Sequence, residues 1–263
     1  MDADSVEKAA GALLGAYASR TALPPLTAAY PDMSVSDAYA VQRAQVAAWT
    51  AEGRQVKGHK VGLTSAAMRR QLGVDQPDFG HLLDSMFVPD DSAADVARFV
   101  QPRVEPEVAF VLGRPLSGPG LTAADAIAAV EFVLPALEII DSRIADWKIT
   151  LPDTVADNAS SGAVVLGTRP TRLDGLDLTL VGCLLHVNGE LTATGAGGAV
   201  LGSPVNALVW LANTLSENGV TLEAGHVVMP GAVTASVPVS AGTAVTARFG
   251  GIGSVSVTFA GAS

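Results

Sequence analysis

The sequence predicts an α+β fold in which an N-terminal helical segment packs on a mixed, largely antiparallel β-roll. Residues 1–55 carry helical patterns, whereas residues 56–263 are dominated by strand patterns with a few inserted helices. The last strand patterns, between residues 237 and 259, alternate β-forming residues with glycine-containing turns, as antiparallel strands do. The sequence contains no fixed-period repeat and no low-complexity linker, so nothing in it divides the strand-rich part further.

The composition predicts a globular protein that binds neither nucleic acid nor a membrane. The chain has 263 residues, 49% of them hydrophobic, and a formal net charge of -10 without any basic run. The longest uncharged stretch, residues 191–216, is interrupted by glycines and a proline, which excludes a continuous membrane helix. The acidic start of the chain is unlike a secretory signal, and the single cysteine, Cys183, suits a reducing cytoplasm.

Two helices are expected in the N-terminal segment. Residues 5–20 form an alanine-rich amphipathic pattern that the Pro24-Pro25 pair stops. A second helix is expected from an N-cap at Ser36 to a glycine stop at Gly53.

The next stretch changes from helical to mixed patterns. Residues 55–64 alternate polar and apolar side chains, which predicts a short strand, and a helix should follow from Ser65 to Gly73. Residues 74–82 have no period and contain a proline and a glycine, which predicts a loop. Residues 87–99 show no decisive pattern.

Two apolar runs are expected to form central strands. One begins after Gln101-Pro102 and continues to Gly113, and the other covers residues 132–141. Between them, Thr122 with Asp125 three residues later resembles a capping box and predicts a helix over 122–131.

The remaining chain is predicted to consist of strands around one clear helix. Serine and proline at 203–204 begin an amphipathic helix that Gly219 ends, and Asn188-Gly189 is a strong hairpin signal. The expected strands cover residues 163–167, 178–187, 227–229, 237–239, 244–249 and 254–259. Residues 141–162 are dense in small polar groups, which is typical of a segment that lines a site.

Three glutamates within the central apolar runs are the most informative residues. Glu105 and Glu107 stand two apart, so on a strand they point to the same face. Glu138 lies inside an apolar run, where an unpaired charge would cost several kcal/mol. Three such carboxylates would form a divalent-cation site, whereas an exposed edge strand is the alternative for the first two. Glycoside hydrolysis is disfavoured because only 5% of residues are aromatic.

Other candidate residues are ambiguous from the sequence alone. Lys60 lies among glycines and valines and is either exposed or a buried partner for an anionic substrate. Asp78 follows a proline by one residue, which is typical of a turn. The four histidines show no metal-ligand spacing, and the glycines at 195–198 lack the lysine of a phosphate loop. No nucleophile-elbow serine is present.

With these residues assembled, the chain resembles the 2-oxopent-4-enoate (2-hydroxypenta-2,4-dienoate) hydratases and 4-oxalocrotonate decarboxylases of the fumarylacetoacetate hydrolase superfamily. The resemblance runs nearly end to end and is carried by residues 60–65, 71–80, 105–107, 135–144, 153–162 and 195–202. Two departures stand out. Pro106 replaces the alanine common between the first two glutamates, and residues 229–234 differ from the hydratase pattern Thr-Gly-Ala-Leu-Gly.

The resemblance implies a β-roll of the fumarylacetoacetate hydrolase type over residues 56–263. It also implies Mg²⁺ or Mn²⁺ on Glu105, Glu107 and Glu138, with Lys60 and Asp78 as catalytic residues. Its implied substrate-binding residues are Leu72, Ser160 and Ser161.

The implied reaction adds water to a small 2-oxo or 2-hydroxydienoate acid in the meta-cleavage catabolism of aromatic compounds. Hydratase chemistry is favoured over decarboxylation because residues 74–79, 146–149 and 153–157 look more like the hydratase pattern. A non-catalytic small-acid-binding or partner subunit is a further alternative. The resemblance also implies a homo-oligomer and association with a pathway aldolase or decarboxylase.

Overall fold

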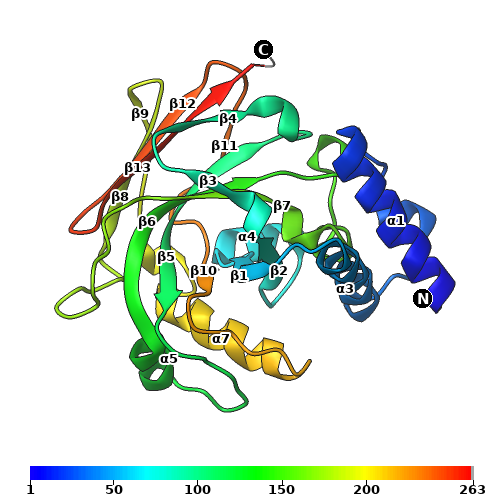
Figure 1. The fold of residues 1–263 in the computed structure, drawn as a ribbon, viewed down its shortest axis with the longest axis horizontal. Coiled ribbons are helices and arrows are strands. Elements are labelled where there is room, and N and C mark those ends of the chain that lie inside the picture. The colour runs from blue at the N-terminus through cyan, green and yellow to red at the C-terminus, as the bar shows by residue number, and fades with distance from the viewer. Residues whose placement is uncertain (262–263) are drawn as a thin grey trace.

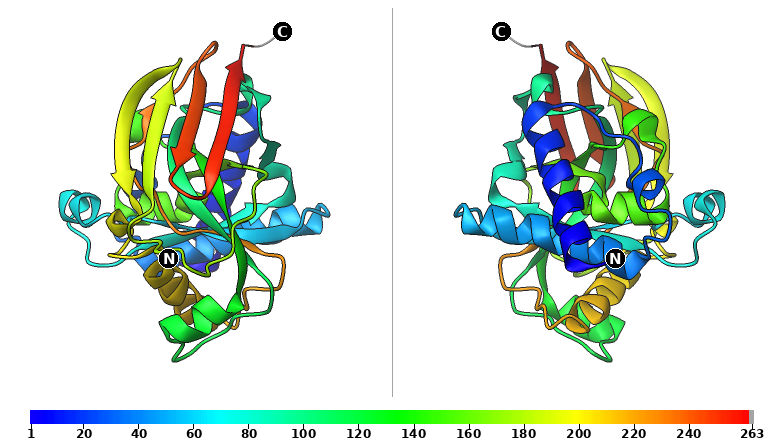
Figure 2. Two further views of the ribbon diagram at one scale, coloured as in Figure 1. Left: turned by 90° about the vertical axis from the view of Figure 1, so that its left-hand side faces the viewer. Right: turned by 90° about the vertical axis from the view of Figure 1, so that its right-hand side faces the viewer.

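The computed structural model of the protein describes residues 1–261, apart from the side chains of Met68, Gln71 and Leu72. Two β-sheets lie against each other, with the N-terminal helices at one side and two further helices at one end (Figures 1 and 2). The helices are α1 (Ala3–Ser19), α2 (Leu26–Ala29), α3 (Val35–Ala51), α4 (Ala66–Leu72), α5 (Ala123–Ala129), α6 (Leu151–Ala156) and α7 (Pro204–Ser216). This arrangement confirms the predicted α+β class.

Local capping decides where the longer N-terminal helices begin. Asp2 caps α1 by accepting a hydrogen bond from the Ser5 N–H at 2.8 Å. Helix α3 begins after Ser34, so the expected N-cap at Ser36 is wrong by two residues. The reason is that Ser34 has an acid three residues later, Asp37, and the two form a capping box.

The first sheet has the strand order β2-β1-β10-β5-β6-β7-β3, with β11 also paired to β5. Its strands are β1 (Val56–Gly62), β2 (Asp78–Leu83), β3 (Phe87–Pro89), β5 (Arg103–Leu112), β6 (Val130–Ile140), β7 (Ser161–Leu166), β10 (Val227–Met229) and β11 (Val237–Pro238). The sheet curls so that β2 contacts β7, far along the strand order. Its concave interior holds one hydrophobic cluster that includes Trp49, Leu82, Ala109 and Met229.

Strand β2 corrects the predicted loop over residues 74–82 from Asp78 onward, whereas residues 74–77 form no helix or strand, as predicted. It pairs antiparallel with β1, with His59 opposite His81, and every one of its residues is buried. A strand buried on both faces shows no polar–apolar alternation, so its sequence lacks the signal on which strand prediction depends.

Pro106 does not interrupt the pairing of β5 with β6. The register runs through Glu105 opposite Glu138 and Pro106 opposite Leu137. The Pro106 carbonyl accepts a hydrogen bond from the Val233 N–H at 3.0 Å, on the edge of β5 that faces away from β6. In a strand the nitrogen of a residue points to the same edge as its carbonyl, so the missing N–H costs no hydrogen bond with β6.

The second sheet packs on the outer face of the first and completes the main core. Its order is β4-β13-β12-β8-β9, and its strands are β4 (Ser92–Asp95), β8 (Gly182–Val187), β9 (Glu190–Ala196), β12 (Ala244–Phe249) and β13 (Gly253–Ala260). The Asn188-Gly189 hairpin is confirmed between β8 and β9, although β8 is shorter than expected. Phe110, Leu137, Leu185, Leu208 and Phe259 lie in the core cluster that joins the two sheets and α7.

The N-terminal helices hold α6 in place. The Gln42 side chain donates to the carbonyls of Phe79 and Val155, and Gln45 donates to the carbonyl of Ala156. These buried amides of α3 satisfy two backbone acceptors at the carboxyl end of α6 and one on β2. The expected domain boundary near residue 55 stays a prediction. None of the described helices combines the length and apolar character needed to cross a bilayer.

Candidate metal centre and active site

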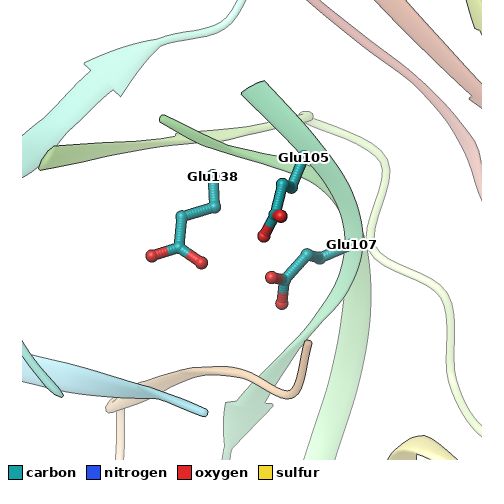
Figure 3. A group of neighbouring side chains, drawn as sticks. All are labelled: Glu105, Glu107 and Glu138. Carbon is teal, nitrogen blue, oxygen red and sulfur yellow. The ribbon is translucent and has the colours of Figure 1, made fainter. Parts of the chain in front are cut away.

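Three carboxylates converge on the concave face of the first sheet. Glu105 and Glu107 project from the same face of β5, and Glu138 lies opposite Glu105 on β6 (Figure 3). One oxygen of each side chain lies within 4.8 Å of the others. Glu107 and Glu138 are buried, and β5 is an interior strand of its sheet. The exposed edge strand considered as an alternative is therefore wrong.

The three acids repel one another and have little solvent to compensate them, because Glu107 and Glu138 are buried and Glu105 is half-buried. Loss of hydration and the neighbouring Glu138 raise the pKa of Glu105 to about 7, from an ordinary 4.5. Burial likewise raises the pKa values of Glu107 and Glu138. Within the described residues, Glu107 Oε1 and Glu138 Oε2 receive no hydrogen bond, and the only cation near Glu138 Oε1 is the ammonium of Lys60, at 3.4 Å. Buried, unsatisfied carboxylate oxygens at this spacing fit a hard divalent cation, which prefers such ligands.

Lys60 supplies a positive charge beside the acids. It lies on β1, is 4% exposed, and places Nζ 3.4 Å from Glu138 Oε1. Burial alone would lower the pKa of Lys60, but Glu138 and Asp78 outweigh that effect and raise it above its ordinary value. The lysine is therefore buried and not exposed, and its acidic neighbours favour its charged form.

Asp78 shares this face of the sheet rather than standing in a turn. It is the first residue of β2, lies opposite Gly62 on β1, and is 2% exposed. Burial raises the pKa of Asp78, and its Oδ1 has no hydrogen-bond partner among the described residues. A Cβ on Gly62 would lie 2.1 Å from that oxygen and 3.4 Å from Lys60 Nζ. Glycine at this position thus leaves the space that both charged groups occupy.

The segment with Ser160 and Ser161 borders the same face through a strained turn. Residues 158–160 adopt left-handed φ angles of 50°, 51° and 53° without a glycine, at a cost of about 1 kcal/mol or more each. Ser161 Oγ lies 2.8 Å from where a Cβ on Gly80 would be, and Gly80 is the register partner of Lys60. The Ser160 hydroxyl shares a 3.2 Å hydrogen bond with Thr154. The predicted Leu72 side chain lies outside the described part of the structure.

One contact of the triad comes from a loop whose role the sequence did not indicate. The Gly231 N–H donates to Glu107 Oε2 at 2.7 Å, so the loop between β10 and β11 is attached to one of the three clustered carboxylates. Gly231 has a φ of 125°, and a Cβ there would lie 2.1 Å from Thr64 Oγ1. A side chain at position 231 would strain the backbone at this φ and would clash with Thr64, so only glycine fits there. The Pro230-Gly231 pair directly after a strand was the available signal.

Sequence reasoning also missed the residues that support the left-handed turn. Arg143 and Asp157 are fully buried and form an ion pair at 2.6 Å, and the Asn158 side chain bonds to the backbone of His81. The available signal was the polar sequence Asp141-Ser142-Arg143, which directly follows the apolar strand that ends at Ile140.

Known proteins resemble this chain over most of its length. The family model described as fumarylacetoacetate (FAA) hydrolase C-terminal matches residues 57–260. A 2-keto-4-pentenoate hydratase from Paraburkholderia xenovorans (strain LB400) is 47% identical over 253 residues, which cover 96% of this chain and 94% of that protein. A 2-oxo-hept-4-ene-1,7-dioate hydratase from Escherichia coli is 44% identical, with 88% of each chain covered.

A solved structure has nearly the same fold. The 4-oxalocrotonate decarboxylase from Pseudomonas putida G7, complexed with magnesium and adipate, superimposes with a TM-score of 0.96. The two sequences are 39% identical, and the match covers 98% of each chain. The predicted fold type is therefore confirmed, and a relative with this fold holds a divalent ion.

Proposed function

The chain belongs to the fumarylacetoacetate hydrolase family, and on that premise we propose that it is a metal-dependent hydro-lyase. Its proposed reaction adds water to 2-hydroxypenta-2,4-dienoate (2-oxopent-4-enoate), or a close analogue, to give a 4-hydroxy-2-oxo acid. The observation that carries this proposal is the convergence of three carboxylates, a buried lysine and a buried aspartate on one concave face. The high identity to named hydratases supports the hydration chemistry.

Glu105, Glu107 and Glu138 are the proposed ligands of Mg²⁺ or Mn²⁺. Their fit to such an ion rests on oxygen-only donors, short mutual distances and carboxylate oxygens without hydrogen-bond partners. When bound, the ion supplies positive charge that stabilises the negative charge developing on the C2 oxygen of the acid.

Lys60 and Asp78 have separate roles in the proposed reaction. The charged Lys60 pairs with the carboxylate or enolate oxygen of the substrate, and so orients it against the acidic triad. Asp78 has a raised pKa and an unpartnered oxygen, which suit proton transfer or water activation. The 2-hydroxydienoate loses its hydroxyl proton and gains one at C5. Water then gives its oxygen to C4 and a proton to C3.

Ser160, Ser161 and Leu72 are the proposed substrate-binding residues. Of these, Ser161 has its hydroxyl against Gly80, on the face that Lys60 shares. The proposed setting is the meta-cleavage catabolism of aromatic compounds in the cytoplasm. The proposed assembly is a homo-oligomer that can associate with a pathway aldolase or decarboxylase.

Decarboxylation is the second candidate, because the neighbouring structure with a TM-score of 0.96 is a 4-oxalocrotonate decarboxylase. In that reaction the same charges would stabilise the dienolate left when 2-oxo-3-hexenedioate loses CO₂. A non-catalytic acid-binding subunit would bind such acids and leave them unchanged.

One experiment separates these candidates. The purified protein with Mg²⁺ is given 2-hydroxypenta-2,4-dienoate and 2-oxo-3-hexenedioate separately, and the products are identified by mass. We expect the first acid to gain the mass of one water, and Glu138→Gln protein to leave it unchanged. Loss of CO₂ from the second acid without hydration of the first would establish the decarboxylase. Recovery of both acids unchanged would favour the non-catalytic subunit.

A further inference from the structure

Arg143 is a fully buried arginine that makes several directed contacts just beyond the end of β6. Its Nε donates to Asp157 Oδ1 at 2.6 Å, and its Nη2 donates to the Asp157 carbonyl at 2.9 Å. Its Nη1 donates to the Ser161 carbonyl at 3.0 Å and to Asp141 Oδ2 at 3.4 Å. The Tyr17 ring lies 4.1 Å from the guanidinium carbon. A planar guanidinium with these partners is fixed in one orientation.

Two of these hydrogen bonds bracket the left-handed turn over residues 158–160. The Asp157 carbonyl directly precedes the turn, and the Ser161 carbonyl directly follows it. Consecutive left-handed residues other than glycine persist only where the surroundings hold them. Arg143 therefore stabilises both ends of a turn that would otherwise relax to a more favourable backbone conformation.

The turn in question forms one side of the candidate active site. The Asn158 amide donates to the His81 carbonyl at 2.9 Å and accepts from the His81 N–H at 2.8 Å. Ser161 Oγ lies against Gly80. Both contacts are with β2, the strand that begins with Asp78. A displacement of the turn would therefore move the face on which the proposed proton-transfer residue lies.

The same guanidinium is linked to the strand that carries two of the acids. Its partner Asp141 accepts hydrogen bonds from the N–H groups of Val100 and Gln101, at 3.0 and 2.7 Å. Strand β5 begins at Arg103, two residues after Gln101. Arg143 thus connects the left-handed turn to the entry of the metal-bearing strand.

We propose that Arg143 is a positioning residue, which holds the wall formed by residues 158–161 at a fixed place relative to the acidic triad. This inference rests on the proposed function, since the wall matters only if a 2-oxo acid binds beside the triad. Lysine cannot replace Arg143 in this role. A single ammonium group cannot reach both bracketing carbonyls and both carboxylates in the same plane.

The test compares Arg143→Lys with the unaltered protein, using pyruvate as a 2-oxo acid without a carbon–carbon double bond to which the enzyme could add water. We expect the Kd of Mg²⁺ to change by less than about threefold, because the three acids are untouched. The Kd of pyruvate in saturating Mg²⁺ should rise about tenfold or more, and kcat for 2-hydroxypenta-2,4-dienoate should fall about 100-fold. Hydrogen exchange should accelerate at the His81 and Ser160 amides, and not in the β5–β6 ladder.

Two variants separate positioning from general destabilisation. Leu208 of α7 is buried in the main core cluster and makes none of the Arg143 hydrogen bonds, so Leu208→Ala should lower Tm through a cavity without weakening pyruvate binding. Ala159→Gly relieves the left-handed strain directly, so adding it to Arg143→Lys should restore pyruvate binding by about threefold or more. If Arg143→Lys does not fold, the double variant that combines Arg143→Lys with Ala159→Gly is compared with the unaltered protein instead.

Unchanged pyruvate affinity in the Arg143→Lys protein would overturn the inference, as would equal weakening by Leu208→Ala. The outcome is distinct from failure of the proposed function. That failure would appear in the unaltered protein, as pyruvate binding without hydration of the dienoate, and the Arg143 comparison with pyruvate would still decide the inference.

Discussion

Lys60 Nζ lies 3.4 Å from Glu138 Oε1, and both side chains are buried beneath the concave face of the sheet. The contact joins β1 to β6, which are separated in the sheet by β10 and β5. The lysine therefore offsets part of the repulsion among the acids before any cation binds. A buried ion pair of this kind is costly to break from one side, because the remaining charge stays unpaired.

Replacing Lys60 with Met should make the protein depend on metal for its stability. The acids lose their buried cation, so the metal-free protein should be destabilised by about 3–5 kcal/mol. Thermal unfolding should show a lower Tm without Mg²⁺ and a larger Mg²⁺-induced increase than in the unaltered protein. Lys57→Met removes an exposed lysine from the same strand and should change neither quantity. An unchanged metal-free Tm in Lys60→Met would contradict the buried pairing.

Replacing Glu107 or Glu138 with Gln should weaken Mg²⁺ binding by about two orders of magnitude or more, because an anionic ligand becomes neutral. Turnover should fall in parallel, while the fold is retained because glutamine preserves the side-chain shape. Titration calorimetry with Mg²⁺ measures the first effect. Glu131→Gln neutralises an exposed acid on β6 and serves as the control. Wild-type affinity in both variants would refute the site.

Metal affinity should depend on pH near neutrality. The pKa of Glu105 in the metal-free protein is raised from 4.5 to about 7, so below pH 7 this ligand holds a proton that the cation must displace. The Kd for Mg²⁺ should therefore be weaker at pH 6 than at pH 8 by about tenfold or more, because the raised pKa values of Glu107 and Glu138 add to the effect of Glu105. Calorimetry in buffers of different ionisation enthalpy should detect proton release on binding at pH 6.5. Affinity that stays constant over this range would show that Glu105 is already ionised.

Asp78→Asn should separate chemistry from metal binding. The substitution keeps the shape beside Gly62 and removes the group proposed to move protons. We expect kcat to fall about 100-fold or more, with the Kd of Mg²⁺ within about threefold of the original value. Asp84→Asn, at an exposed position after the end of β2, is the matched control. If metal binding were lost instead, Asp78 would belong to the ligand set.

The sequence was sufficient for features that depend on local pattern. Alternation along β5 placed Glu105 and Glu107 on one face, and capping residues located the helix after Thr122. It was insufficient where the deciding contacts are distant in sequence. The burial of Lys60 follows from its neighbours across the curled sheet, and nothing near it in the chain indicates them.

Other features escaped prediction because their sequence signal is weak or ambiguous. Strand β2 is buried on both faces and shows no alternation. The sequence does not show whether the Pro106 nitrogen faces β6 or the other edge of β5, because that depends on how β5 pairs with its neighbours. Arg143 donates hydrogen bonds to carbonyls 14 and 18 residues later in the chain, and no local sequence motif indicates such contacts.

The proposed acidic ligands stand on paired strands, whereas the surfaces around them come from the turn over residues 158–160 and the loop that contains Gly231. The continuous β5–β6 ladder, which Pro106 leaves intact, keeps the acids in register whatever those connections contain. Substitutions in the connections can therefore change which acid is accepted without dismantling the cation site. Because the carboxylates and the surrounding loops belong to separate parts of the fold, the scaffold is open to redesign. New substrates can be sought by exchanging the loops while the proposed cation site stays unchanged.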